Sequence, residues 1–122
     1  TAGAAALRAA AARSALRAVA VLEGRPDLAG PALERVKAPA LLVVAGRDTP
    51  LLRLNHQALR RLRSPAMLEI APGAMHGLGD PEAREMAVTR VVDWFCTHLG
   101  VREPDRISTG FGKVKHPVIL IR

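Results

Sequence analysis

The sequence predicts an α/β fold in which parallel strands alternate with helices. Apolar runs at residues 16–22, 40–45 and 66–71 have the length of strands, and the run 40–45 is apolar without alternation. An uninterrupted apolar run is typical of a strand that is buried on both faces of a parallel sheet. Helical patterns at residues 51–63 and 81–99 follow the second and third runs. Strands that alternate with helices in this way indicate a parallel sheet.

The N-terminal third adds a helix and a loop to this pattern. Nine of residues 1–15 are alanine, the best helix former, so they predict a helix before the first strand. Residues 24–31 contain Gly, Pro and Asp and are expected to form a loop. Residues 32–36 have room for one helical turn before the second strand.

The helix predicted at residues 51–63 is amphipathic, with arginines on its outer side. Leu52, Leu59 and Leu62 fall near helical spacing and are expected to face the core. Ser64 and Pro65 should end this helix, because a residue before proline avoids the helical conformation.

The last helix has clear signals at both ends. Asp80 suits the N-cap, Pro81 suits the first helical position, and Gly100 suits the position after the last turn. One buried stripe is expected along this helix, formed by Val88, Val91, Phe95 and Leu99. Beyond it, residues 101–122 lose the helical period; the segment "HPVILI" is either a further strand or part of an unrelated extension.

The composition limits the class of protein. A chain of 122 residues is enough for one small domain, and a single cysteine, Cys96, allows neither an internal disulfide nor a cysteine-based zinc site. Cys96 is therefore expected to be a small core residue, and the chain to work in the cytoplasm. No apolar run approaches the roughly 20 residues that span a bilayer, so no membrane segment is expected.

The net charge of +7 raises the question of nucleic-acid binding. The arginines are scattered along the sequence, and the densest group, "RRLR" at residues 60–63, lies on a predicted helix, where it reads as a solvated face. Only 2% of the residues are aromatic, so there is little to stack on bases. These observations argue against a nucleic-acid partner.

Two chemically active side chains follow neighbouring strands. Asp48 comes after the strand at residues 40–45, and His76 comes after the strand at residues 66–71. Reactive groups of parallel α/β sheets gather at the carboxyl ends of the strands. An aspartate that orients a histidine, which in turn takes a proton from a nucleophile, forms two parts of a catalytic triad. The alternatives are that Asp48 only caps the next helix and that His76 is an ordinary loop residue.

The segments "KAPALLVVAGRDTPLLRLNHQALRRL" and "LEIAPGAMHGLGDPEAREMAVTRVVDWF" resemble the C-terminal part of an α/β-hydrolase, in particular of the dienelactone hydrolase-like group. The resemblance implies that Asp48 is the catalytic acid and His76 the catalytic base. It also implies that residues 1–100 form the C-terminal part of a hydrolase domain, followed by a tail, residues 101–122, of uncertain structure. The substrate would be a small ester or lactone.

The same resemblance concerns the start of the chain. In this family the nucleophile lies on a sharp turn between a strand and a helix, and "TAGAAAL" is similar to the helix behind that turn. The backbone N–H of Thr1 would then serve the oxyanion hole, and the nucleophile would immediately precede Thr1. We therefore expect a fragment that lacks the N-terminal half of its domain, is inactive alone and leaves a raw sheet edge.

Two other functions remain open. The chain could be a non-catalytic structural or binding fragment, or Thr1 could act as an N-terminal nucleophile with its own amine as the base. The three other histidines, His56, His98 and His116, show no metal-ligand spacing, and no cofactor or metal is expected.

A few remaining side chains have simple interpretations. The serines lack the sharp turn of a nucleophile, which argues against a catalytic role for Ser14, Ser64 and Ser108. Arg25 and Asp27 could touch substrate, but a salt bridge within the loop is the preferred interpretation.

Overall fold

The computed structural model describes residues 2–71, 79–100 and 118–121. The elements are α1 (Ala2–Ala12), β1 (Ala18–Leu22), the 3₁₀ segment η1 (Pro26–Arg35), β2 (Ala40–Ala45), α2 (Thr49–Arg61), β3 (Ala66–Ala71), α3 (Pro81–Leu99) and β4 (Val118–Ile121).

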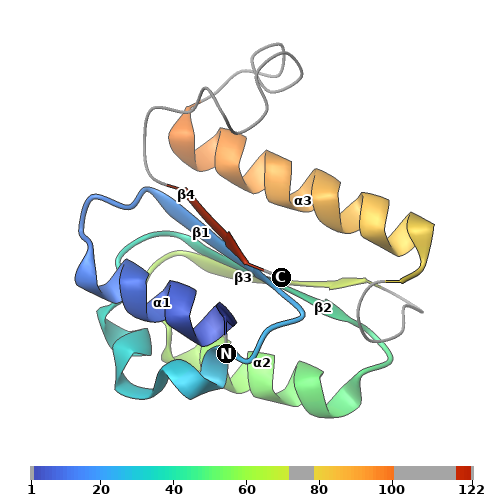
Figure 1. Cartoon of the computed structure of the whole chain (residues 1–122), viewed down its shortest axis with the longest axis horizontal. Coiled ribbons are helices and arrows are strands. Elements are labelled where there is room, and N and C mark those ends of the chain that lie inside the picture. The colour runs from blue at the N-terminus through green and yellow to red at the C-terminus, as the bar shows by residue number, and fades with distance from the viewer. Residues whose placement is uncertain (1, 72–78, 101–117, 122) are drawn as a thin grey trace.

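The strands form one sheet in the order β3-β2-β1-β4, and every neighbouring pair is parallel. Helices α1 and α2 and the segment η1 cover one face, and α3 covers the other (Figure 1). The predicted α/β fold with a parallel sheet is confirmed. None of the helices in the described ranges is long and apolar enough to cross a membrane.

Two cores lie on the two faces of the sheet, and β2 contributes to both. Leu42 belongs to the core under α1, η1 and α2, while Leu41 and Val43 belong to the core under α3. All six residues of β2 are buried. Successive side chains of a strand point to opposite faces, so an apolar run without alternation is the pattern that this central strand requires.

The edge of β1 is covered by β4. Val118 pairs with Ala18, and Ile121 pairs with Val21, in a parallel register. The tail therefore contributes a strand, which was one of the two alternatives for "HPVILI". β1 is therefore an inner strand, and β4 is the edge strand on this side of the sheet.

Helix α2 begins earlier than predicted, and its predicted apolar face is only partly right: Leu62, just after the helix, is buried as expected. Thr49 is its first residue, and Leu52 and Leu59 are only partly buried. The helical residues that are fully buried are Leu51, Asn55 and Ala58. The earlier start follows from the cap at Asp48, and the buried face of the helix includes a polar residue, Asn55.

Helix α3 has the predicted ends. The Asp80 side chain accepts a hydrogen bond from the Ala83 N–H at 2.9 Å, and Gly100 has a left-handed backbone with φ 71°. The buried residues of the helix are Ala83, Ala87, Val91 and Phe95. The predicted stripe is therefore partly wrong: Val88 is 53% exposed, because two alanines, rather than larger side chains, face the sheet. Cys96 is only half-buried and not a core residue.

The segment expected to be a loop, residues 24–31, contains short 3₁₀ turns. They belong to η1, which is interrupted at Gly30, where φ is 57°. Pro31 follows this kink and has no backbone N–H to donate. Short 3₁₀ turns tolerate such interruptions better than an α-helix would.

Candidate active site at the carboxyl edge of the sheet

Asp48 lies in the turn between β2 and α2. Its backbone N–H donates to the Ala45 carbonyl at 3.2 Å, and its Oδ1 accepts from the Leu51 N–H at 3.1 Å. Asp48 therefore caps α2. A cap satisfies a backbone donor at the helix start and fixes the side chain that provides it. Asp48 is half-buried, so its carboxylate is oriented but within reach of solvent.

Strand β3, which precedes His76 in the sequence, ends beside this turn. Ala71, the last residue of β3, pairs with Ala45, the last residue of β2, and its carbonyl accepts from the Gly46 N–H at 2.9 Å. The segments that carry Asp48 and His76 thus start from paired residues at one edge. His76 itself lies outside the described residues.

The start of α1 reaches the same edge. Gly3 approaches Gly24, the second residue after β1: a Cβ on Gly3 would lie 3.4 Å from the Gly24 Cα and 2.8 Å from the Val21 Cγ1. A side chain at either glycine would press on Val21, so the close approach of the helix to the strand end requires both glycines. Thr1 lies outside the described residues, directly before this contact.

Glu23 connects the ends of β1 and β2. Its Oε1 accepts from the Ala45 N–H, and its own N–H donates to the Val43 carbonyl at 2.9 Å. Its φ of 54° is in the left-handed region, which is uncommon for a residue other than glycine. Through these two bonds, Glu23 continues the hydrogen bonding between β1 and β2 just beyond the end of β1. It also holds the Ala45 backbone, from which the turn with Asp48 begins. No feature of the sequence predicted this role.

Asn55 connects α2 to the end of β1. The side chain is fully buried, and its Nδ2 donates to the Gly24 carbonyl at 3.2 Å and to the Leu51 carbonyl at 2.9 Å. Its Oδ1 has no hydrogen-bond partner among the described residues. The sequence could have suggested this residue, because a polar side chain stands there within the apolar spacing of α2.

Arg25 and Asp27 form the predicted salt bridge. The Arg25 Nε and Nη2 atoms donate to the two Asp27 carboxylate oxygens at 2.9 and 2.8 Å. Hydrogen bonding to Arg25 holds the pKa of the Asp27 carboxyl below its usual range, although partial burial opposes the shift. This pair fixes the start of η1 beside the edge that carries Asp48.

The other candidate side chains lie elsewhere. Ser14 precedes β1 and Ser64 precedes β3, so both belong to the amino edge, opposite Asp48. Ser108 and His116 lie outside the described residues. Within residues 2–71, 79–100 and 118–121, no group of three His, Cys, Asp or Glu side chains could hold a metal ion.

The described helices carry two histidines, His56 on α2 and His98 on α3. His56 is exposed on α2. His98 contacts the ring of Trp94, with ring centroids 4.2 Å apart, and burial lowers the pKa of its imidazole. The Trp94 indole N–H donates to the Pro39 carbonyl, before β2, at 3.4 Å, so His98 belongs to the amino-edge side of the molecule.

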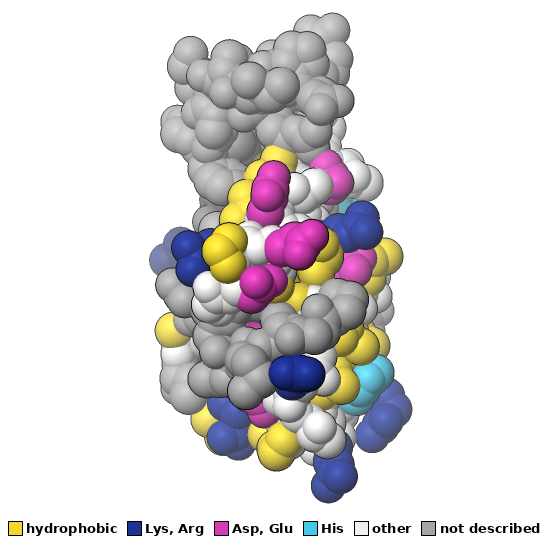
Figure 2. All heavy atoms as spheres, turned by 90° about the vertical axis from the view of Figure 1, so that its right-hand side faces the viewer, with side chains coloured by type: hydrophobic (Ala, Val, Ile, Leu, Met, Phe, Trp, Pro, Cys, Tyr) yellow, Lys and Arg dark blue, Asp and Glu magenta, His cyan; other side chains and the backbone are white. Residues whose placement is uncertain are grey.

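Figure 2 looks onto the carboxyl edge and shows acidic side chains gathered over the start of α3. Asp80, Glu82 and Glu85 belong to this end of the helix. Negative side chains are favourable there, because the N-terminus of a helix carries a partial positive charge.

The comparisons with known proteins agree with this architecture. No family model matches the chain. A solved structure, the dienelactone hydrolase from Anabaena variabilis, is 42% identical and superposes with a TM-score of 0.77, covering 79% of this chain and 45% of that one. The chain therefore has a dienelactone hydrolase-like α/β fold, of the α/β-hydrolase superfamily.

Two curated relatives come from Mycobacterium tuberculosis, strains CDC 1551 and H37Rv, and each carries the name "Putative phosphoribosyl transferase". Each is 44% identical over 98 residues, which is 80% of this chain and 22% of the relative. The chain thus spans less than half of the solved hydrolase and about a fifth of these relatives.

Proposed function

We propose that this chain is part of an ester- or lactone-hydrolysing enzyme in which Asp48 is the catalytic acid and His76 the catalytic base. The observation that carries the proposal is the position of Asp48, which caps α2 and is half-buried, beside Ala45 and Ala71, the paired last residues of β2 and β3. The hydrolase-like fold supports the same assignment.

The nucleophile of the proposed reaction is a residue outside these 122. Both described serines belong to the edge opposite Asp48, and the similar hydrolase is more than twice as long as the matched region. We assign the nucleophile to the residue that precedes Thr1 in the complete domain, with the Thr1 N–H as an oxyanion-hole donor.

The proposed mechanism follows from these assignments. His76 takes the proton of the nucleophile as it attacks the carbonyl carbon of the ester or lactone, and the carbonyl oxygen becomes negative. Backbone N–H groups stabilise that oxygen. His76 then gives its proton to the leaving alcohol, and a second cycle with water releases the acid. Asp48 keeps the imidazole in the orientation and tautomer that this requires.

The name of the mycobacterial relatives offers a second candidate, phosphoribosyl transfer. The observation in its favour is the 44% identity. The matched region is only 22% of those proteins, so their name applies mostly to sequence with no counterpart here. The hydrolase proposal rests on twice that coverage and on the geometry of Asp48.

A fluorophosphonate probe tests the proposal. We expect no adduct on the 122-residue chain, and an adduct on the residue before Thr1 in a longer protein that continues upstream. Hydrolysis of a p-nitrophenyl ester and of a lactone should accompany the labelling, and both should fall in the variants Asp48→Asn and His76→Ala.

Each other result points to an alternative. An adduct on Thr1 of the 122-residue chain would favour the N-terminal nucleophile. If the longer protein is folded by circular dichroism but shows neither labelling nor hydrolysis, the result would favour a non-catalytic structural or binding role. Consumption of phosphoribosyl pyrophosphate by the longer protein, without ester hydrolysis, would favour phosphoribosyl transfer.

A further inference from the structure

Among the described residues, acidic and basic side chains are unevenly distributed along the chain. Residues 2–65, which build α1, η1, α2 and their loops, carry eleven Arg and Lys but four Asp and Glu; residues 79–100, which build α3, carry two and four. Five of these basic residues, Arg8, Arg35, Arg53, Arg60 and Arg61, lie on α1, η1 and α2, which cover one face of the sheet. Such an imbalance gives that face a positive potential.

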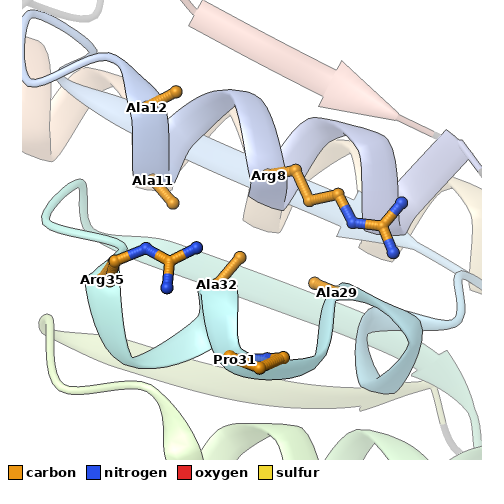
Figure 3. A pocket seen from close by; sticks show the side chains of 7 residues that line it. All are labelled: Arg8, Ala11, Ala12, Ala29, Pro31, Ala32 and Arg35. Carbon is orange, nitrogen blue, oxygen red and sulfur yellow. The ribbon is translucent and has the colours of Figure 1, made fainter.

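A groove runs across this basic layer between α1 and η1. It contains a hollow of about 560 Å³ whose floor is made of alanine side chains and whose ends carry two arginines (Figure 3). The residues that line this hollow include Arg8, Ala11, Ala29, Ala32 and Arg35.

A second hollow, of about 710 Å³, continues the groove toward the amino edge of the sheet. It shares Ala11 and Arg35 with the first hollow and adds Lys37, Arg63 and Ser64. The buried Ser64 Oγ has no hydrogen-bond partner among the described residues. The two hollows form one continuous surface, which we call the basic groove.

Little in the described part of the chain neutralises the basic groove. Arg35 and Lys37 are exposed and have no ion-pair partner among the described residues. Arg8 donates to the Leu28 carbonyl at 2.8 Å, a neutral acceptor. The acid that lines the groove, Glu34, is bound by Arg61 at 2.8 and 3.3 Å.

We propose that the basic groove is a docking surface for an acidic amphipathic helix of a partner protein. Helices commonly bind by laying an apolar face into a groove, and an alanine floor lets a backbone approach closely. Cations at both ends of the first hollow, and beyond it, complement carboxylates that flank such an apolar face. No lining residue is aromatic, so the groove offers no platform on which nucleic-acid bases could stack.

The proposal is independent of the proposed hydrolase function. The basic groove lies between α1 and η1 and continues to the amino edge, whereas Asp48 is at the carboxyl edge. Loss of peptide binding would therefore leave the hydrolase assignment untouched, and the reverse holds as well.

The test uses a stapled, alanine-based helical peptide of about 20 residues with glutamates beside its alanine face, labelled with fluorescein. We expect saturable binding to the 122-residue chain by fluorescence anisotropy. Amide shifts should be confined to the basic groove in nuclear magnetic resonance spectra. The same peptide with lysine in place of glutamate should not bind.

Three variants separate binding in the groove from a general effect of positive charge. Arg35→Glu with Lys37→Glu should weaken binding roughly tenfold or more. Arg53→Glu with Arg60→Glu makes the same charge change on exposed α2 residues outside the groove and should weaken it much less. Ala12→Trp, at an exposed lining position, should block the peptide by filling the hollow without removing charge.

Three results would overturn the proposal. Absence of saturable binding is the first, and equal weakening by the groove pair and the α2 pair is the second. The third is a single-stranded oligonucleotide that binds more tightly than the peptide and depends on the same two residues. Circular dichroism of each variant distinguishes lost binding from lost folding.

Discussion

The two edges of the sheet use polar residues in opposite ways. At the carboxyl edge, Glu23 and Asn55 bind backbone groups of other segments, the Ala45 N–H and the Gly24 carbonyl, and Asp48 caps α2 through the Leu51 N–H. At the amino edge, the basic groove presents long, exposed side chains such as Arg35 and Lys37. Directed hydrogen bonds fix position, whereas exposed charges act over a distance and tolerate movement. The carboxyl edge therefore suits the proposed catalysis, and the amino edge suits the proposed docking of a partner.

The largest expected effect is at Asp48. In the longer, active protein, Asp48→Asn should lower kcat/KM by about 10²- to 10⁴-fold, because an amide cannot stabilise the imidazolium that forms on His76. Its stability should change by less than about 0.5 kcal/mol, since asparagine caps a helix as well as aspartate does. Steady-state kinetics and urea unfolding measure the two effects.

Asp48→Ala serves as the companion variant. It should lose the activity and also about 1 kcal/mol of stability through the missing cap. Full activity in Asp48→Asn would mean that this residue is only a helix cap.

The second effect is steric, at Gly24. A Cβ there would lie 2.4 Å from the Val21 Cγ1 and 3.5 Å from the Gly3 Cα, so Gly24→Ala should lower the free energy of unfolding by about 1–3 kcal/mol. Gly79→Ala is the matched control, because no atom of the described residues lies within 4 Å of its added Cβ. Equal midpoints of urea unfolding for the two variants would refute the close packing of α1 on the end of β1.

The third effect concerns the link between β1 and β2. Glu23→Ala leaves the Ala45 N–H without its side-chain acceptor and should cost about 1–2 kcal/mol. Glu23→Gln keeps an acceptor oxygen and should recover most of that stability. If Gln and Ala were equally destabilising in chemical denaturation, the carboxylate charge rather than the hydrogen bond would be responsible.

The fourth effect is the pH dependence from the Arg25–Asp27 pair. The folded-state pKa of Asp27 is lowered by Arg25, so this stabilisation is present above the ordinary carboxyl pKa and is lost as the pH falls through the folded-state value. When the pH is lowered from 7 to about 3, the free energy of unfolding should therefore fall less for Asp27→Asn than for the parent chain. Glu85→Gln, an exposed acid on α3, is the control; identical slopes for all three proteins would contradict the prediction.

The smallest effect is expected at the basic groove. Arg35→Glu with Lys37→Glu should change the stability of the chain by less than about 0.5 kcal/mol, because both side chains are exposed and neither is in an ion pair among the described residues. Thermal unfolding checks this. A large loss would show that the amino edge, like the other edge, depends on directed contacts.

Much of the fold could be predicted because its signals are local. The uninterrupted apolar run of β2, the Asp-Pro start of α3 and its glycine end each specify a structure within a few residues. The stripe of α3 was predicted less well, because burial of Val88 depends on the neighbouring alanines that face the sheet. The contacts of Glu23 and Asn55 join segments 22 and 31 residues apart, and no local pattern specifies them.

The sequence by itself determined the α/β class, the ends of α3, the salt bridge of Arg25 with Asp27 and the presence of Asp48 after a buried strand, since each depends on neighbouring residues. Only the tertiary structure decided that β4 pairs with β1, that Gly3 packs on Gly24 and that Arg8 and Arg35 line one groove. Those features join segments that are distant along the chain, and their energies exist only once the layers have packed together.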